Sequence, residues 1–166
     1  AWPRLSPDGR RLAVVSWDHP AMPWDGTLLR LADLSVGMQP RWQVLAGGPG
    51  ESVLEPQWDS DGSLYFLSDR GGWWNLYRWR DGVVELLTTE TDGEIGAPLW
   101  QLGQGSYVLT GDGRALLRVS RGTVDRLCLL DLATRAMTPL DLPFVAFGAL
   151  GRVDADTAYA TAVAVD

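Results

Sequence analysis

Asp-Gly dipeptides recur along this chain and constrain its fold more than any other feature. They occur six times, beginning at Asp8, Asp25, Asp61, Asp81, Asp92 and Asp112. Asp and Gly tolerate the positive φ of tight hairpin turns. The segments between the dipeptides are short runs of leucine, β-branched and aromatic residues with weak helical periodicity. The pattern predicts an all-β chain built from hairpins.

The hairpins form a longer repeat. Three segments share a proline, a large apolar residue two positions later, a turn containing glycine and an apolar strand; they start at Pro3, Pro56 and Pro98. A second hairpin follows in each unit, for example TLLRLADL with RWQVLAG. Four strands in about 40 to 50 residues is the size of one β-propeller blade. We expect a partial β-propeller of about three four-stranded antiparallel blades plus the start of a fourth.

The repeat also predicts where the blades lie. We place the three blades and the start of the next at roughly 1–52, 53–94, 95–150 and 151–166. The segment DRLCLLDLATRAM at 125–137 has helical propensity, but its place in the repeat predicts two strands joined by a turn. Blades bury their faces against each other, so we expect the nine tryptophans to pack between them.

Composition excludes several classes of partner. The net charge is −7 and the sequence pI is about 4.6, so a surface that binds nucleic acid is not expected. No apolar run approaches the roughly 18 residues of a membrane span, so no membrane partner is expected. All 14 basic residues are arginine, a bias typical of a GC-rich bacterial genome. We expect a bacterial, cytoplasmic protein in which Cys128, flanked by leucines, is a buried thiol.

The residues needed for catalysis, metal binding or cofactor binding are missing from the sequence. His19 is the only histidine, and no GxSxG motif is present, so we expect no catalytic residues. One histidine and one cysteine cannot form a metal site with soft ligands. The glycine-rich AGGPGES at 46–52 lacks the Gly-Lys-Ser/Thr of a phosphate loop and is interpreted as a connection between blades. We therefore expect no metal and no cofactor.

One stretch concentrates unusual side chains. SWDHPAMPWDGTLL, at 16–29, follows a predicted strand and holds two tryptophans, two aspartates and two prolines beside the single histidine. Two interpretations remain open: the stretch is a rigid connection whose prolines fix the backbone, or its polar groups face a substrate cavity. The candidate cavity residues are Trp17, Asp18, His19, Trp24 and Asp25.

The same stretch carries a family resemblance. SPDGRRLAVVSWDHPAMPWDGTLL, followed by GGPGESVLEPQWDSDGSLYFLSDRGGWWNLYRW, resembles the N-terminal β-propeller of the prolyl oligopeptidase family of serine peptidases, in its acylaminoacyl-peptidase and dipeptidyl-aminopeptidase branch. The resemblance covers nearly the whole chain. It implies a propeller that gates peptide access to a C-terminal α/β-hydrolase domain, which this chain lacks. The catalytic serine, aspartate and histidine belong to that domain.

The resemblance also defines the expected partners. They are the hydrolase domain of the parent chain and its peptide substrates. Some dipeptidyl peptidases of the family hold a substrate's amino terminus with propeller glutamates, but no matching motif surrounds Glu51 or Glu55. Open blade edges also predict self-association. The alternative is a TolB-like or WD-repeat-like propeller that acts as an interaction scaffold without an enzymatic domain.

Overall fold

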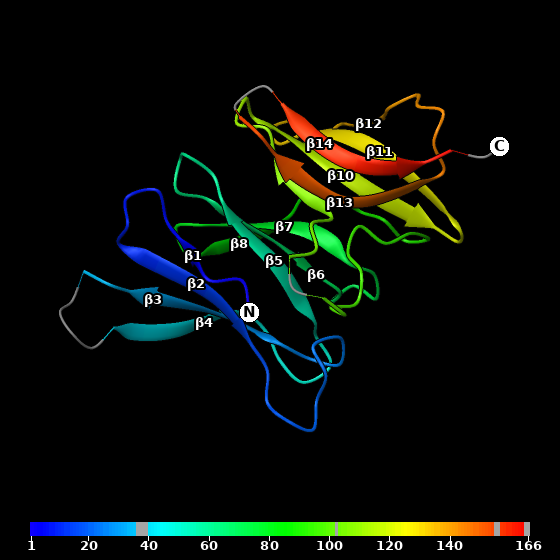
Figure 1. Cartoon of the computed structure of the whole chain (residues 1–166). Helices are drawn as coiled ribbons and strands as arrows, with labels where there is room; N and C mark the ends of the chain where they lie inside the picture. The colour runs from blue at the N-terminus through cyan, green and yellow to red at the C-terminus, as the bar shows by residue number, and fades with distance from the viewer. Residues whose placement is uncertain (36–39, 102, 155–156, 165–166) are drawn as a thin grey trace.

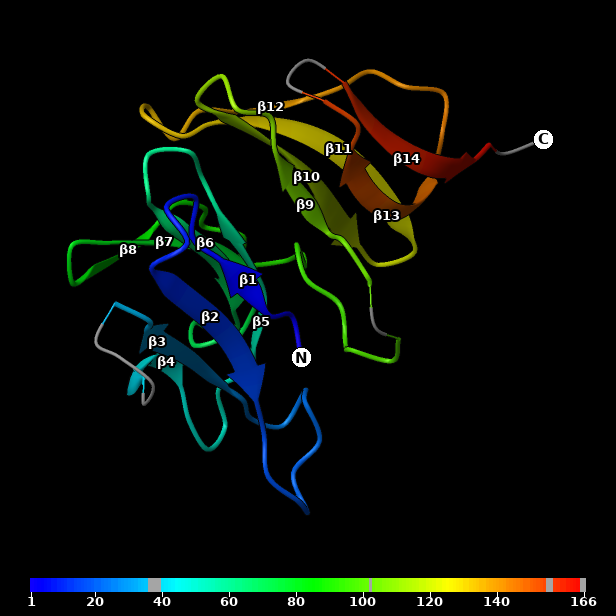
Figure 2. The same ribbon diagram turned by 60° about the vertical axis from the view of Figure 1, so that its left-hand side comes forward.

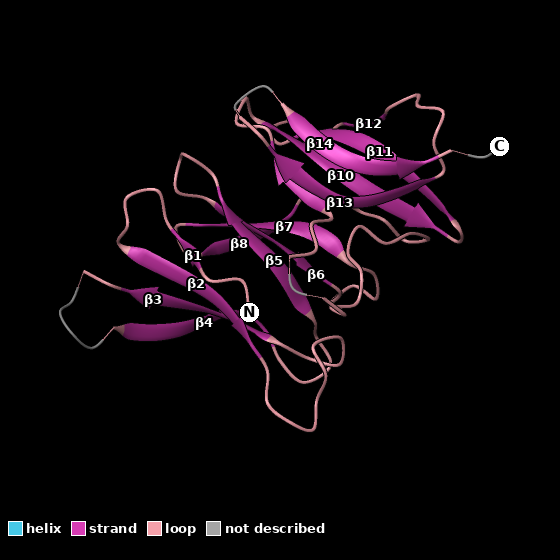
Figure 3. Ribbon diagram, in the orientation of Figure 1, coloured by secondary structure: helices cyan, strands magenta, loops and turns pink. Residues whose placement is uncertain are grey.

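The computed structural model describes residues 1–35, 40–101, 103–154 and 157–164. All regular secondary structure in this part of the chain is β-strand (Figures 1 and 3). The strands are β1 (Arg4–Leu5), β2 (Arg11–Ser16), β3 (Leu28–Asp33), β4 (Arg41–Gly47), β5 (Val53–Trp58), β6 (Leu64–Ser68), β7 (Asn75–Arg80), β8 (Val83–Leu86), β9 (Tyr107–Leu109), β10 (Arg114–Arg121), β11 (Val124–Asp131), β12 (Met137–Pro139), β13 (Ala146–Arg152) and β14 (Ala158–Val163). The prediction of an all-β chain is confirmed.

The strands form successive antiparallel meanders. β1–β4, β5–β8 and β9–β12 make three four-stranded sheets in chain order, and β13 pairs with β14. Figure 1 shows these sheets following one another from blue to red, with the β13–β14 hairpin beside the third sheet. Three blades and the start of a fourth are therefore confirmed; residues 155–156 and 165–166 of that fourth unit lie outside the described residues.

The inner strands of the second blade are buried on both faces because this blade lies between the first and the third. All five residues of β6 are buried, whereas burial alternates along β2. Its side chains join one apolar cluster with the inner face of the first blade and with Ala115, Leu117 and Val119 of β10. A second cluster, which includes Val108, Leu127, Phe147 and Leu150, packs the third blade against β13. The core is thus a series of seams between blades.

Tryptophan packing agrees with the prediction only in part. Trp2, Trp74 and Trp79 are buried in the main cluster. Trp42, Trp73 and Trp100 are 48%, 37% and 72% exposed, so the expectation that all nine pack between blades is wrong for these three. Cys128 is buried, as predicted.

The repeat has a different register in its third unit from the one we expected. Pro98 and Trp100 lie in the connection between β8 and β9, and the third blade opens at Tyr107. The shared feature is an Asp-Gly turn between the first and second strands, spaced by 53 and 51 residues instead of 53 and 42. The turn glycines Gly9, Gly62 and Gly113 have φ of 69°, 83° and 81°. Proline is a poor marker because inter-blade connections also tolerate it, whereas these turns require the left-handed backbone.

The fourth unit begins earlier than residue 151. β12 ends at Pro139 and β13 begins at Ala146, so the expected boundary falls inside β13. The glycines of FGALGR lie within β13 and not in a turn. A Cβ on Gly151 would be 2.3 Å from the Tyr159 ring on the neighbouring strand. Glycine is needed there for close approach of a cross-strand side chain.

The segment 125–137 is strand, turn and strand, as predicted. β11 ends at Asp131 and β12 begins at Met137. The Arg135 amide donates to the Asp131 carbonyl over 2.8 Å, which closes the turn. The pairing of both strands in the third sheet therefore outweighs the helical propensity of the leucines.

The chain reverses alternately at two rims, which we define here. The turn rim carries the Asp-Gly turns that begin at Asp8, Asp61, Asp81 and Asp112. The loop rim carries the connections 17–27, 48–52, 69–74 and 87–106. Figure 2 shows the 17–27 connection projecting beyond the ends of β2 and β3. The other two Asp-Gly dipeptides, at Asp25 and Asp92, lie in these longer connections and not in tight hairpins, contrary to expectation.

Candidate functional site

The 17–27 connection is attached to the start of the second blade through buried polar groups. The Thr27 hydroxyl donates to the Val53 carbonyl over 2.8 Å and accepts from the Val53 amide over 2.6 Å. The Thr27 amide donates to the Glu51 carbonyl over 2.9 Å. The Ser52 hydroxyl donates to the Pro23 carbonyl over 2.7 Å. These bonds fix the connection on the loop rim.

Two glycines allow the backbones to approach this closely. A Cβ on Gly47, whose φ is +95°, would lie 1.9 Å from the Thr27 carbonyl oxygen. A Cβ on Gly26 would lie 2.6 Å from the Gly48 carbonyl oxygen. The glycines of AGGPGES therefore serve the contact between connections, in agreement with the inter-blade interpretation of that segment.

The five predicted site residues divide between packing and exposure. Trp17 and Trp24 are half-buried and pack against the main core cluster. Asp18, His19 and Asp25 are exposed. The Asp25 Oδ2 accepts from the Met22 amide over 2.9 Å, so this side chain caps a loop amide. The arrangement agrees with a rigid connection, and the exposed groups remain candidates for contact with a substrate.

Two hollows flank Trp17 on the loop rim. One, of about 340 Å³, is lined by Trp17, Asp18 and Asp25 together with the 48–50 backbone. The other, of about 290 Å³, is lined by residues that include Trp17, His19, Met22 and Trp100. The five predicted residues are therefore brought to one region of one rim but do not converge on a single cavity.

Trp100 belongs to this region, although the repeat that starts at Pro98 predicts it inside a blade. Its ring centroid lies 4.3 Å from that of Trp24, with a tilt of 39° between the planes. The two side chains are 76 residues apart in the chain. Only the arrangement of the blades brings the connections 17–27 and 87–106 together, so no local sequence signal identifies the pair.

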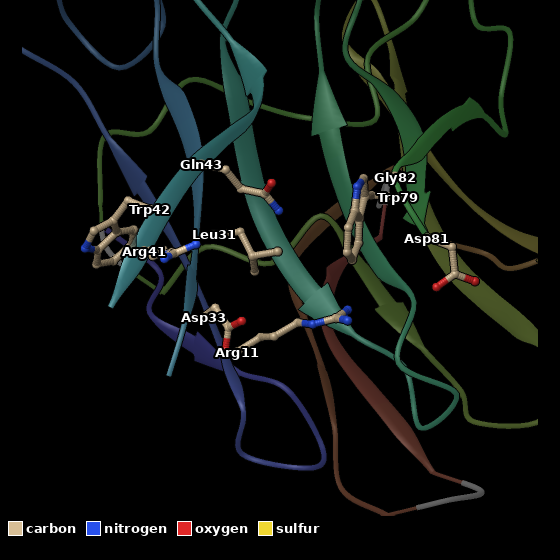
Figure 4. Close-up of a pocket in the computed structure, with 9 residues that line it drawn as sticks. All are labelled: Arg11, Leu31, Asp33, Arg41, Trp42, Gln43, Trp79, Asp81 and Gly82. Carbon is tan, nitrogen blue, oxygen red and sulfur yellow. The ribbon is translucent and has the colours of Figure 1, made fainter. Parts of the chain in front are cut away.

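A separate hollow of about 420 Å³ opens on the turn rim between the first two blades (Figure 4). Leu31 and Gln43 point toward Trp79 of β7, and Arg11 reaches across from β2. The Arg11 guanidinium carbon lies 5.4 Å from the Trp79 ring centroid. The Asp33 Oδ1 in this hollow accepts from the amide and the hydroxyl of Ser35, so it is engaged locally.

Carboxylates of the loop rim are partly buried. The Ser52 amide donates to Asp69 Oδ1 over 2.6 Å, and the Trp74 amide donates to Glu94 Oε2 over 2.7 Å. Burial raises the pKa of both carboxyl groups. These two groups hold backbone amides of neighbouring connections in place.

Glu55 is buried at the start of the second blade, a burial that the sequence does not indicate. It is 3% exposed and accepts from the Ser106 amide over 2.7 Å and from the Ser106 hydroxyl over 2.9 Å. No local signal identifies it, because EPQW reads as an ordinary strand and Ser106 lies 51 residues away. Its contacts are structural ties between blades, in agreement with the absence of a motif that would assign it to a peptide amino terminus.

The described residues hold neither a metal cluster nor a membrane-spanning element. No group of three or more His, Cys, Asp or Glu side chains in this part of the chain could bind a metal ion. No helix there is long and apolar enough to cross a membrane. Of the described residues that line the hollow around His19, none is a serine or a cysteine, so a nucleophile next to this imidazole is not provided.

Known structures match the chain over nearly its whole length. The crystal structure of puromycin hydrolase superposes with a TM-score of 0.88 at 33% identity, over 98% of this chain and 25% of that chain. A puromycin-hydrolyzing peptidase of Mycobacterium tuberculosis gives 0.80 at 38% identity, over 89% and 22%. A prolyl endopeptidase gives 0.69 at 15% identity, over 96% and 22%, which supports the fold alone.

Two other comparisons returned nothing. No family model matches the sequence. No curated protein matches it.

The fold and the loop rim define a partial β-propeller. The chain belongs to the prolyl oligopeptidase family and corresponds to the β-propeller of its members. It spans about a quarter of the length of the puromycin hydrolase that it matches.

Proposed function

We propose that this chain is the non-catalytic propeller region of a serine peptidase and gates the access of peptides to a hydrolase domain elsewhere in the parent protein. The observation that carries the proposal is the fixed loop rim. Its connections are held in place by buried hydrogen bonds at Thr27 and Ser52, and they present the exposed Trp100 ring against the half-buried Trp24. A rigid wall of this kind discriminates substrates by size.

The proposed substrates are short peptides and peptide-like amides. Two similar structures carry puromycin hydrolysis in their names. The catalytic serine, aspartate and histidine would come from the hydrolase domain. An interaction scaffold without that domain is the alternative, and the downstream gene separates the two: a GxSxG motif followed by aspartate and histidine supports the peptidase.

The test compares two substrate sizes in the parent protein. Trp24→Ala removes half of the aromatic pair, so we expect kcat/KM for a long peptide to rise relative to that for puromycin or a dipeptide-sized amide. Trp42→Ala is the matched control, because Trp42 is a 48% exposed tryptophan away from the loop rim; it should leave the ratio unchanged. Equal ratios in both variants would contradict gating by this rim.

A second variant tests whether the connection has a chemical role. His19→Ala should leave the turnover of the smallest substrate unchanged, since the exposed imidazole lines a hollow without a nucleophile. Loss of that turnover in a folded protein would show that His19 takes part in the reaction.

A further inference from the structure

A buried carboxylate lies at the seam between the second and third blades. Glu55 is on β5, where the pairing with β6 is irregular between Leu54 and Gln57. Its φ is 53° and its side chain is 3% exposed. A residue other than glycine keeps a left-handed backbone conformation only where the surrounding contacts fix it. The local backbone therefore holds this carboxylate in the seam.

Ser106, at the start of the third blade, donates two hydrogen bonds to the Glu55 side chain. The Ser106 amide donates to Oε2 over 2.7 Å and the Ser106 hydroxyl donates to Oε1 over 2.9 Å. The Tyr107 hydroxyl also donates to the Glu55 backbone carbonyl over 2.7 Å. Both carboxyl oxygens and the backbone of one residue thus tie the second blade to the start of β9.

The neighbouring cation is coupled to Glu55 through Ser106. Arg118 of β10 donates through Nη2 to the Ser106 hydroxyl over 3.4 Å and through Nη1 to the Phe147 carbonyl of β13 over 3.1 Å. Its Nε is buried without a hydrogen-bond partner among the described residues. The Arg118 guanidinium therefore divides its hydrogen bonds between Ser106 and Phe147, and its positive charge only partly neutralises the negative charge of the Glu55 carboxylate.

Burial dominates the titration of this group. Desolvation raises the pKa of Glu55 from 4.5 to about 7, against the hydrogen bonds from Ser106 and the charge of Arg118. Tyr107 of β9 faces the same site, with Tyr65 of β6 and Arg4 of β1 nearby. Burial raises the pKa of Tyr107 well above its ordinary value, so this phenol stays neutral while Glu55 titrates.

We propose that Glu55 is a proton-operated tie between the second and third blades, in which the protonated carboxyl group holds the seam closed and its ionisation loosens the seam. In the protonated form one oxygen accepts from the Ser106 amide while the carboxyl O–H donates to the Ser106 hydroxyl oxygen. On ionisation the proton passes to solvent, and a charge that Arg118 only partly neutralises remains in the seam.

The direction of the pH dependence follows from linkage. The folded-state pKa of Glu55 lies above its ordinary value of 4.5, so the folded chain binds this proton more tightly than the unfolded chain does. The stabilisation is complete below the ordinary value and is lost as the pH rises through about 7. The seam should therefore be tightest in mild acid.

Hydrogen exchange of amides at the seam tests the proposal in the 166-residue chain. The reporters are the Ser106 amide, which donates to Glu55, and the Arg118 amide, which donates to the Ser106 carbonyl over 2.8 Å. After correction for intrinsic exchange, we expect their protection to fall at least about tenfold between about pH 5 and about pH 8. The Leu87 amide, which donates to Leu76 within the second blade, should keep its protection.

Variants assign the effect to Glu55. Glu55→Gln replaces the carboxyl group with an amide that does not titrate, so it should abolish the pH dependence of protection at the two reporter amides. Asp69→Asn is the matched control, because burial also raises the pKa of Asp69 but this group accepts from Ser52 outside the seam; the seam should respond to pH as in the wild type. An unchanged pH dependence in Glu55→Gln would overturn the proposal.

A third variant keeps the test decisive if Glu55→Gln does not fold. Ser106→Ala retains the carboxyl group but removes the hydroxyl that bonds to it in both its charged and its protonated form. The pH at which protection of the Arg118 amide is lost should then coincide with the Glu55 carboxyl titration of the variant, followed by carbon-13 NMR. A loss of protection that does not follow that titration would also overturn the proposal.

Discussion

The pKa values of carboxyl groups are shifted in opposite directions on the two rims of this molecule. On the turn rim, exposed carboxylates accept hydrogen bonds from nearby groups, and their pKa values are lowered: Ser6 and Arg10 bind Asp8, Ser35 binds Asp33, and Arg114 with Thr110 lowers the pKa of Asp112 to about 2. At the loop rim and the adjoining seam, burial raises the pKa values of Glu55, Asp69 and Glu94.

The difference reflects what each rim has to do. A turn within one blade closes on itself, so its carboxylate stays in water and stabilises only local amides and hydroxyls. Connections within and between blades meet at the loop rim, and there Glu55, Asp69 and Glu94 accept from amides of other segments in buried or half-buried sites. The loop rim and the adjoining seam therefore carry the carboxyl groups whose pKa values are raised.

The largest expected difference in the free energy of unfolding comes from replacing one glycine on each rim with alanine. Gly47→Ala places a Cβ 1.9 Å from the Thr27 carbonyl oxygen at a φ of +95°, so we expect a loss of about 4 kcal/mol or more in the free energy of unfolding. Gly62→Ala on the turn rim has a φ of +83° and open space around the new Cβ; it should cost about 1 kcal/mol. Urea unfolding measures both, and equal losses would remove the distinction between the rims.

A hydroxyl-to-methyl exchange gives a smaller contrast. Thr27→Val leaves the buried amide and carbonyl of Val53 without their hydroxyl partner, so we expect a loss of about 2 kcal/mol. Thr110→Val removes bonds to Asp112 and to the Arg114 carbonyl on the exposed turn rim and should cost less than about 0.5 kcal/mol. Thermal unfolding of the two variants compares them, and a larger loss in Thr110→Val would reverse the assigned roles.

The smallest contrast is in the pH dependence of single carboxylates. The lowered pKa of Asp112 contributes stability that is present above its ordinary value of 3.8 and is lost as the pH falls toward about 2. Since the Asp112 pair is exposed and screened, Asp112→Asn should cost at most about 0.5 kcal/mol at neutral pH and less near pH 2, where the carboxyl group is partly protonated. Denaturant unfolding at both pH values tests this.

The loop-rim counterpart has the opposite sign. The raised pKa of Asp69 makes its ionisation unfavourable to the fold, so this contribution to stability is lost as the pH rises from 3.8 through the folded value. Asp69→Asn should therefore flatten that part of the profile. A stability that rises with pH because of Asp69 would contradict the comparison between the rims.

Local patterns predict blades well and their boundaries poorly. Asp-Gly turns and alternating strands need only a few neighbouring residues, so the hairpins and the turn at 131–135 follow from them. Pro98 misleads because the connection 87–106 carries the same residue types as a strand start. The boundary at 151 fails because β13 continues through it, with Gly151 packed against Tyr159 across the sheet. These failures arise where a residue is chosen for a partner on another strand or connection.

Within the candidate site, the packed tryptophans and the capping by Asp25 agree with a rigid connection, one of the two interpretations that the sequence leaves open. The contact of Trp24 with Trp100 and the burial of Glu55 do not. The exposed side chains Asp18 and His19 are correctly placed on a connection, but their part in binding is still a prediction.

The sequence by itself determined the all-β class, the four-stranded unit and the family, because turn chemistry, strand alternation and the WDHPAMPWD stretch are local properties of the chain. The tertiary structure alone decided which connections meet on the loop rim, where Gly47 had to be a glycine and why Glu55 is buried. Those properties depend on contacts between residues that lie 20 to 76 positions apart, and the free energy of such contacts exists only after the blades have packed together.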